Sequence, residues 1–199
     1  KDVVGIENFR NLESGAVITC NHFNAFDSFA IQVAYDRSEH KEKKFYRVIK
    51  EGNYTSFPGF FGFLMRNCNT LPLSSNFATM KKFVKAVDEL LQEGNFVLFY
   101  PEQSMWWNYR KPRPMKDGAF RIAARSGAPV IPFFITMEDS EFTDESNGFP
   151  IQEYTVNILP AIYPEKDKPA RFASRVMADE NYRVWKEVYE DFYGIPLTY

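Results

Sequence analysis

The chain has 199 residues, a formal net charge of −2 at pH 7 and 25% charged residues. It is therefore long enough for one domain with a sizeable core, and it lacks the basic excess typical of a nucleic-acid-binding protein. Its two cysteines are too few for a disulfide framework or a zinc site and suit a reducing compartment.

Three further observations concern membranes. No apolar run approaches the length of a membrane-spanning helix, and no signal peptide is present. The chain begins at Lys1 rather than Met, so we expect a missing upstream segment, which could include a membrane tether. Aromatic residues make up 17% of the chain, which indicates either a large core or an apolar surface that meets lipid or a long-chain ligand.

The first elements alternate between strand and helix. Residues 3–8 favour a short edge strand, and residues 16–21 form an apolar run typical of a buried central strand. Residues 28–36 predict a helix. After a charged loop, residues 45–50 predict a second strand of the central sheet.

The middle of the chain contains the clearest helix. Residues 56–66 are apolar and contain Gly and Pro, which favours a short, irregular helix that forms core or the wall of an acyl-chain site. Residues 70–73 are expected to be extended. Residues 76–93 repeat apolar positions at three and four, and Gly94 ends the predicted helix. Residues 96–100 then predict a strand inside a parallel sheet.

The remaining segments continue the alternation. Residues 118–126 predict a helix, 129–135 a buried strand, 138–149 an acidic surface loop and 154–159 a strand. A long helix is expected over 169–193. The pattern predicts a single mixed α/β domain in which helices flank a largely parallel sheet. The inner side of the long helix is predicted to hold Phe172, Val176, Tyr182, Trp185, Val188, Tyr189 and Phe192.

A histidine and an aspartate lie at the first strand-to-helix junction. His22 and Asp27 are about 140° apart on a regular helix, but at the entry to a helix they can meet. The carboxylate could then accept the proton of one ring nitrogen and leave the other nitrogen as a base. On this stretch alone a purely structural interpretation is favoured, with His22 as a capping or hydrogen-bonded histidine and Asp27 as a helix N-cap. The other histidine, His40, lies in a charged stretch that predicts a solvated loop.

A second group of polar residues follows the strand at 96–100. Since ligands of open α/β sheets bind beyond the carboxyl ends of strands, His22 and Glu102 could face one crevice. A carboxylate that caps a loop is the structural alternative for Glu102.

A basic run lies further along the chain, before the helix that Gly118 opens. A helix N-terminus beside Lys and Arg is a competent anion site, although a solvated loop would have the same composition. The run contains Arg110, Lys111, Arg113 and Lys116.

Two other kinds of site are disfavoured. A serine hydrolase would need a Gly-x-Ser-x-Gly turn, and Ser104 lacks the flanking glycines. We expect no metal site, because His22 has no cluster of ligands at suitable spacing.

Four blocks in order resemble the glycerolipid acyltransferase family, whose best-known members are the 1-acylglycerol-3-phosphate acyltransferases. The resemblance extends from about Val3 to Ile135. It implies one acyltransferase domain over residues 1–199, with the motifs in residues 3–135 and a C-terminal strand and long helix in 136–199. The blocks are Asn-His-x4-Asp at 21–27, Tyr-Pro-Glu-x-Ser at 100–104, Met-Lys-x-Gly-Ala at 115–119 and Val-Ile-Pro at 130–132.

The resemblance implies transfer of a fatty acyl group from acyl-CoA or acyl carrier protein to a glycerol hydroxyl, with no cofactor beyond this co-substrate. His22 would be the general base and Asp27 would orient it. Glu102 and its loop, with Ser104, would bind the glycerol part of the acceptor. Lys116 and the backbone around Gly118 would bind phosphate.

Two phosphate ligands of the family are absent. The family block that corresponds to residues 100–105 usually reads Phe-Pro-Glu-Gly-Thr-Arg, whereas this chain has Gln103, Ser104 and Met105. A further family block, which aligns with Leu71-Pro72-Leu73, usually ends in an arginine, and that arginine falls on Ser75. Either Arg110, Lys111 and Arg113 replace these arginines, or the acceptor is not a lysophosphatidate. Trp106 and Trp107, which follow the altered block, could stack on a sugar, lie at a membrane interface or belong to the core.

The sequence therefore predicts an O-acyltransferase that acts peripherally at the cytoplasmic side of a membrane on a lipid acceptor such as 1-acylglycerol-3-phosphate. Two alternatives remain open. One is the same chemistry on a non-phosphate acceptor such as a glycolipid or polyol. The other is a lipid-binding domain whose site has decayed.

Overall fold

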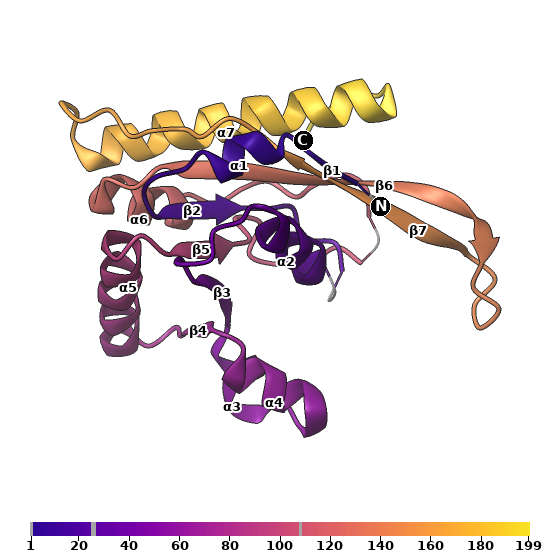
Figure 1. Ribbon diagram of the computed structural model, residues 1–199, viewed down its shortest axis with the longest axis horizontal. Helices are drawn as coiled ribbons and strands as arrows, with labels where there is room; N and C mark the ends of the chain where they lie inside the picture. The colour runs from indigo at the N-terminus through magenta and orange to yellow at the C-terminus, as the bar shows by residue number, and fades with distance from the viewer. Residues whose placement is uncertain (1, 25–26, 108) are drawn as a thin grey trace.

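The computed structural model describes residues 2–24, 27–107 and 109–199, and within them the chain forms one α/β unit around a seven-stranded sheet (Figure 1). The strand order is β1-β7-β6-β2-β5-β3-β4. The predicted α/β fold with a largely parallel sheet is confirmed. In chain order the elements are β1 (Asp2–Val4), α1 (Ile6–Arg10), β2 (Ala16–Thr19), α2 (Asp27–Arg37), β3 (Phe45–Lys50), α3 (Glu51–Ser56), α4 (Gly59–Asn67), β4 (Thr70–Leu73), α5 (Phe77–Gln92), β5 (Phe96–Phe99), α6 (Gly118–Ser126), β6 (Val130–Thr143), β7 (Pro150–Ile158) and α7 (Ala170–Tyr193).

The two central strands, β2 and β5, are buried along their whole length. They pair in parallel, with Ala16 opposite Phe96 and Thr19 opposite Phe99. Every named strand pair in the described residues is parallel except β6 with β7. Since both faces of a parallel sheet are covered, the continuous apolar runs that predicted these strands have a direct physical reason.

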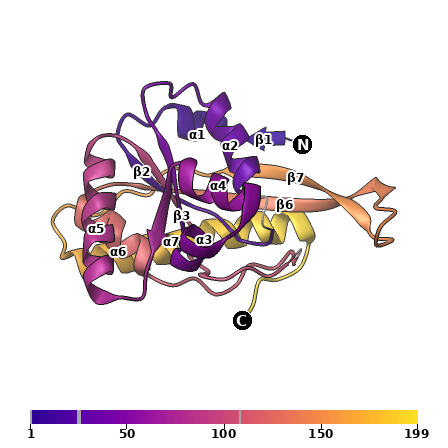
Figure 2. The same ribbon diagram turned by 90° about the horizontal axis from the view of Figure 1, so that it is seen from below.

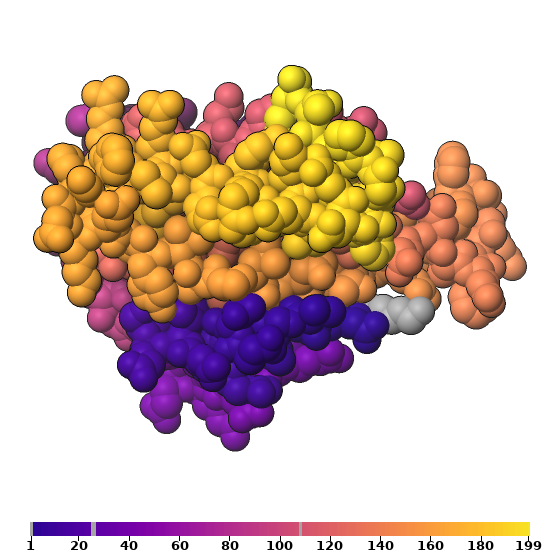
Figure 3. All heavy atoms as spheres, turned by 90° about the horizontal axis from the view of Figure 1, so that it is seen from above, coloured from indigo at the N-terminus to yellow at the C-terminus, as the bar shows by residue number. Residues whose placement is uncertain are grey.

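Helices cover the two faces of the sheet with separate apolar clusters. On one face, Phe9 of α1 and Ile31 of α2 pack against Ile18 and Leu98 of the central strands. The other cluster joins α5, α6 and α7 to the opposite side of the same strands; its members include Phe83, Val87, Leu91, Phe120 and Met177. Figure 3 shows α7, in orange to yellow, lying along the length of the molecule.

The strands β6 and β7 form a long hairpin whose end projects from the body of the molecule (Figures 1 and 2). The prediction of a loop at 138–149 is wrong for residues 138–143, because β6 continues to Thr143, and agrees with the turn at residues 144–149 before β7 begins at Pro150. Beyond Met137 the β6 residues are largely exposed on both faces of the hairpin. No alternating apolar pattern therefore marks this part of the strand.

Other differences arise at helices. Residues 6–10 form α1 rather than a strand, after Gly5 adopts a left-handed φ of 74°. Residues 51–56 form α3, which the sequence did not indicate. On α7, Trp185 and Tyr189 are buried as predicted. Phe172, Val176 and Phe192 are exposed, so their predicted inner position is wrong.

His40 is half-buried rather than solvated. Its Nε2 lies 2.7 Å from the carbonyl oxygen of Phe9, and its ring contacts Phe9 and Phe96. Burial lowers the pKa of His40. Among the described residues, no helix is both long and apolar enough to cross a membrane.

Candidate active site

The candidate site lies beyond the carboxyl ends of β2 and β5, which are neighbours in the sheet. His22 follows β2 and Glu102 follows β5, and the two residues are in direct contact through the backbone of His22. The expectation that both face one edge of the sheet therefore agrees with the topology.

Asn21 fixes the end of β2 just before His22. It is 2% exposed. Its Oδ1 accepts from the Ile135 N–H at 2.8 Å, and its Nδ2 donates to the Ile135 carbonyl at 3.0 Å. The amide thus replaces a strand residue beside β6, because the β2–β6 pairing stops at Thr19 and Pro132.

His22 and Asp27 form a hydrogen-bonded pair. The distance from His22 Nδ1 to Asp27 Oδ2 is 2.7 Å, and the Asp27 side chain is 1% exposed whereas that of His22 is 25% exposed. Because a carboxylate only accepts hydrogen bonds, this contact assigns the proton of a neutral imidazole to Nδ1 and the lone pair to Nε2. Asp27 is the first residue of α2, and Ala25 and Phe26 of the motif lie outside the described residues.

Tyr100 completes the surroundings of this pair, and the sequence analysis did not single it out. Its hydroxyl donates to Asp27 Oδ1 at 2.6 Å. Its ring stacks on the His22 imidazole, with centroids 4.1 Å apart and planes inclined by 21°. The only signal in the sequence is a Tyr where the family block usually has Phe.

The carboxyl group of Glu102 joins two loops by accepting hydrogen bonds from their backbone N–H groups. Oε1 accepts from the His22 N–H at 2.8 Å and Oε2 from the Arg113 N–H at 2.7 Å. The residue is 4% exposed. Burial raises the pKa of Glu102 to about 8, although both N–H donors act to lower it. These contacts favour the structural alternative for Glu102; its predicted contact with an acceptor stays a prediction.

The side chains of the basic run contact different parts of the molecule. Arg113 donates to Ser104 Oγ and lies over the Trp106 ring, with its Cζ 5.0 Å from the centroid. Arg110 pairs with Asp139 at the base of the hairpin, and Lys111 lies over the ring of Tyr199.

Lys116 and Gly118 lie at the entry to α6. The Lys116 N–H donates to the Pro101 carbonyl at 2.8 Å, and its side chain is exposed. Gly118 is the first residue of the helix. The structure thus brings Arg113 and Ser104 to the loop that holds His22, whereas Arg110 points to the hairpin.

Burial also affects the other titratable groups near His22. It raises the pKa of Tyr100 and of Cys20 well above their ordinary values, and the negative charge of Asp27 adds to both effects. Tyr100 therefore keeps its proton as a donor to Asp27 at neutral pH. Among the described residues, no group of three His, Cys, Asp or Glu side chains could hold a metal ion.

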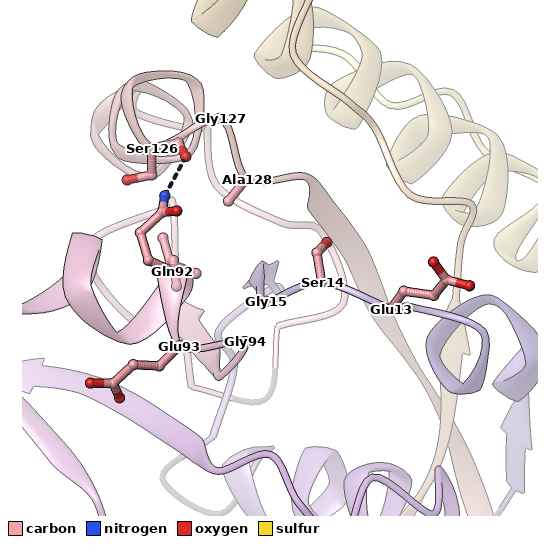
Figure 4. A pocket seen from close by; sticks show the side chains of 10 residues that line it. Glu13, Ser14, Gly15, Gln92, Glu93, Gly94, Ser126, Gly127 and Ala128 are labelled. Carbon is pink, nitrogen blue, oxygen red and sulfur yellow. Dashed lines mark hydrogen bonds between the residues drawn. The ribbon is translucent and has the colours of Figure 1, made fainter.

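A hollow elsewhere on the surface is separate from these residues (Figure 4). It lies before β2 and beside the ends of α5 and α6, at the opposite end of the central strands from His22. Gln92 Nε2 closes one side by donating to the Ser126 carbonyl at 2.8 Å. None of the predicted site residues lines it.

Comparison with known proteins places this geometry in a family. The model of the Acyltransferase family matches residues 2–136, so the chain belongs to this family, as the sequence blocks indicated. A curated relative is the chloroplastic 1-acyl-sn-glycerol-3-phosphate acyltransferase BAT2 of Brassica napus, which is 28% identical over 132 residues, 66% of this chain and 36% of the relative. The aligned region thus spans about a third of that protein.

A solved structure supports the fold. The 1-acyl-sn-glycerophosphate (LPA) acyltransferase PlsC from Thermotoga maritima superimposes with a TM-score of 0.54 over 92% of this chain and 72% of that one. The sequences are 19% identical, so the likeness concerns the arrangement of helices and strands.

Proposed function

We propose that the protein is an O-acyltransferase that moves a fatty acyl group from acyl-CoA or acyl carrier protein to a hydroxyl of a lysophospholipid such as 1-acylglycerol-3-phosphate. The observation that supports this most directly is the His22–Asp27 pair at the carboxyl ends of β2 and β5 in a member of the Acyltransferase family. The names of the two similar proteins point to the same acceptor class.

In the proposed reaction, Nε2 of His22 takes the proton of the acceptor hydroxyl as its oxygen attacks the thioester carbonyl carbon. The C–O bond forms, and the tetrahedral intermediate collapses by breaking the C–S bond. The thiolate leaves and receives the proton from the imidazolium. A positioned base of this kind contributes about 10²- to 10⁴-fold, and alignment of the two substrates contributes the larger part.

Asp27 has two roles in this scheme. Its bond to Nδ1 keeps the lone pair on Nε2, and its charge stabilises the imidazolium while the proton resides there. No acyl-enzyme is needed because the thioester is already activated.

For a phosphate-bearing acceptor, Arg113 is the cation that the contacts favour most. Its backbone N–H and that of His22 share the Glu102 carboxyl, which keeps the two residues in one loop arrangement. Lys116 is the next candidate, through its exposed side chain at the entry to α6. The non-phosphate alternative rests on the two missing family arginines and on Arg110, which already pairs with Asp139.

The site also has an apolar surface within reach of a membrane. Phe57, Phe60, Phe61 and Phe63 of the α3–α4 segment are exposed, so the predicted core position for 56–66 is wrong for them. Phe29 on α2, two residues after Asp27, is also 54% exposed. We propose that these phenylalanines contact lipid and hold the protein peripherally at the cytoplasmic side of a membrane.

The reaction is tested by release of free thiol from palmitoyl-CoA with lysophosphatidate as acceptor. We expect turnover in the wild type and a loss of at least about 100-fold in His22→Ala. His40→Gln removes the other histidine and should keep the activity. Acyl transfer that is undiminished in His22→Ala would refute the general-base role, and release with no acceptor dependence would favour a decayed site or another acceptor.

The acceptor class is tested with Arg113→Ala, which keeps the backbone N–H to Glu102. Loss of a charged hydrogen bond of about 1.5–3 kcal/mol should raise KM for lysophosphatidate roughly 10- to 100-fold and leave KM for monoacylglycerol unchanged. Arg175→Ala, on the exposed side of α7, is the matched control. An equal effect of Arg113→Ala on both acceptors would rule out Arg113 as the phosphate ligand, and a lower KM of the wild type for monoacylglycerol than for lysophosphatidate would favour the non-phosphate alternative.

The membrane surface is tested by flotation with vesicles of phosphatidylethanolamine and phosphatidylglycerol. Phe60→Ser with Phe63→Ser should reduce the floated fraction several-fold, because each exposed Phe forfeits apolar burial in lipid. Phe142→Ser on the hairpin is the control, since Phe142 is 71% exposed and Phe60 is 69% exposed. Equal flotation of all three proteins would rule out this surface.

A further inference from the structure

Tyr100 makes two contacts that meet at the His22–Asp27 pair. Its hydroxyl donates to Asp27 Oδ1 at 2.6 Å, and its ring lies face to face with the His22 imidazole at 4.1 Å. One side chain, which follows β5, therefore contacts both members of a pair that follows β2. A core tyrosine has no need of either contact to fill space.

The Tyr100 hydroxyl bonds the Asp27 oxygen that does not face His22. Asp27 Oδ2 is 2.7 Å from His22 Nδ1 and also accepts from the Phe23 and Asn24 N–H groups, at 3.3 and 3.4 Å. Oδ1 accepts from Tyr100. Because both oxygens have directional partners, the carboxylate cannot rotate away from the imidazole.

The two contacts act differently on the imidazole. A hydrogen bond from a hydroxyl to an ionised carboxylate is short and strong, and it draws negative charge toward Oδ1, away from Nδ1. The flat ring, in contrast, presents its negative face to the imidazole and favours the imidazolium that forms during proton transfer.

We propose that Tyr100 is a positioning residue for the general base: its hydroxyl holds Asp27, and its ring sets the plane of His22. The proposal rests on the proposed acyltransferase function only where turnover is measured. The hydroxyl is a donor that a Phe at this place would not supply.

The charged and titratable groups around the imidazole come from several elements. Asp27 is the nearest carboxylate, and Arg47 is a cation on β3 that interacts electrostatically with Tyr100. Among the described residues, the groups that interact electrostatically with one another here are Cys20 at the end of β2, Asp27 on α2, Arg47 on β3, Tyr100 and Glu102 after β5, Arg113 on the basic run and Tyr154 on β7. Tyr100→Phe leaves all the others in place.

The first experiment is the pH profile of acyl transfer for the wild type and Tyr100→Phe. Without the hydroxyl, Asp27 places more negative charge beside Nδ1, so the imidazolium is favoured and less neutral base is present at low pH. We expect the acidic limb to move to higher pH by about half a unit, a fraction of the one to three units that a full neighbouring charge can cause. Turnover on the plateau should fall roughly 3- to 30-fold because Asp27 is less well held. Tyr100→Leu, which also removes the ring, should lose more.

The second experiment does not need activity. In protein labelled with ¹⁵N-histidine, the two imidazoles are followed by NMR against pH, and His40→Gln assigns the His22 signals. The His22 midpoint should shift upward in Tyr100→Phe. Tyr35→Phe is the control, because the Tyr35 hydroxyl bonds the Lys43 and His40 carbonyls and has no contact with Asp27.

The outcomes separate the two proposals. A wild type without acyl transfer would refute the proposed function, and the NMR midpoint would still test Tyr100. An active wild type whose pH profile and His22 midpoint are unchanged in Tyr100→Phe would overturn the role of Tyr100. A midpoint that moves equally in Tyr35→Phe would also overturn it.

Discussion

At the scale of single residues, Glu102 is a carboxyl group placed where ionisation is unfavourable. It is 4% exposed, and burial raises its pKa to about 8, above the ordinary value of 4.5. Between these two values the unfolded chain is ionised at this position while the folded protein retains the proton. The folded state thus binds more protons, so this residue makes stability fall as pH rises from about 4.5 to about 8.

Glu102→Gln should therefore change the pH dependence of stability. The variant still offers one acceptor to the two N–H donors of His22 and Arg113, so we expect a loss of about 1–3 kcal/mol at pH 6. The wild type loses part of its stability by pH 8.5, whereas the variant has no carboxyl to titrate. The difference in free energy of unfolding between the two proteins should therefore be smaller at pH 8.5 than at pH 6, as measured by urea unfolding at both pH values. A difference that grows with pH would contradict the raised pKa of Glu102.

Asn21 is the second residue whose contacts yield a stability prediction. In Asn21→Ala, the N–H and carbonyl of Ile135 both lose their partner in a buried place. We expect a loss of about 2–6 kcal/mol in urea unfolding, since each of the two unpaired buried groups costs about 1–3 kcal/mol. Asn67→Ala, an exposed residue with one bond to the Phe63 carbonyl, should cost less than about 1 kcal/mol. Equal losses would mean that Asn21 does not join β2 to β6.

At the scale of helices and strands, the sequence predicted those ends of helices that depend on neighbouring residues. Asn76 caps α5 through bonds to the Ala78 and Thr79 N–H groups, and Gly127 ends α6 with a φ of 67°. The start of α5 was predicted from the apolar pattern that begins at Asn76 and the end of α6 from Gly127, whereas the capping bonds of Asn76 were not predicted. The length of β6 was not predicted, because its outer half pairs with β7 while both its faces meet solvent. The outer half of β6 depends on pairing with β7, and the residues of β6 alone do not indicate this pairing.

Two glycines of the α3–α4 segment offer a matched pair. A Cβ at Gly62 would lie 1.8 Å from the Phe57 carbonyl oxygen, whereas a Cβ at Gly52 would meet nothing within 4 Å. Gly62→Ala should lose about 1–3 kcal/mol, because the Phe57 backbone must move. Gly52→Ala in α3 should be neutral or gain at most about 1 kcal/mol. Urea unfolding of both variants checks this, and a harmless Gly62→Ala would show that the α3–α4 corner can relax.

At the scale of the whole molecule, the sequence predicted the edge of the sheet where the site lies but not how the residues are connected there. The blocks at 21–27 and 100–104 are about 80 residues apart, and the parallel pairing of β2 with β5 brings them together. The bond from Tyr100 to Asp27 and the two N–H bonds of Glu102 depend on side-chain directions. Those directions follow from packing across the strands, so composition and spacing could not supply them.

The hairpin end is the part of the molecule that we expect to be dispensable for folding. Phe142 and Phe149 are both 71% exposed, and the end projects beyond the body in every view (Figures 1–3). Replacing residues 141–150 by Asn-Gly would join Ser140 to Ile151 through a two-residue turn and keep the Asp139–Gln152 pairing and the Arg110–Asp139 ion pair. Stability to urea should change by less than about 1 kcal/mol, as for surface changes in general.

The same replacement should alter how the molecule meets a charged membrane. Residues 141–150 contain Glu141, Asp144 and Glu145 and no Lys or Arg, so the shortened protein loses negative charge without losing a cation. Its binding to vesicles rich in phosphatidylglycerol should therefore strengthen in low salt and return to the wild-type level as salt screens the charges. A control with Glu141→Gln, Asp144→Asn and Glu145→Gln keeps the hairpin and should show the same gain. If the shortened protein binds better and this control does not, the hairpin end obstructs the membrane by its bulk. If the shortened protein binds less and this control, which keeps Phe142 and Phe149, does not, the hairpin itself contacts lipid through these two phenylalanines.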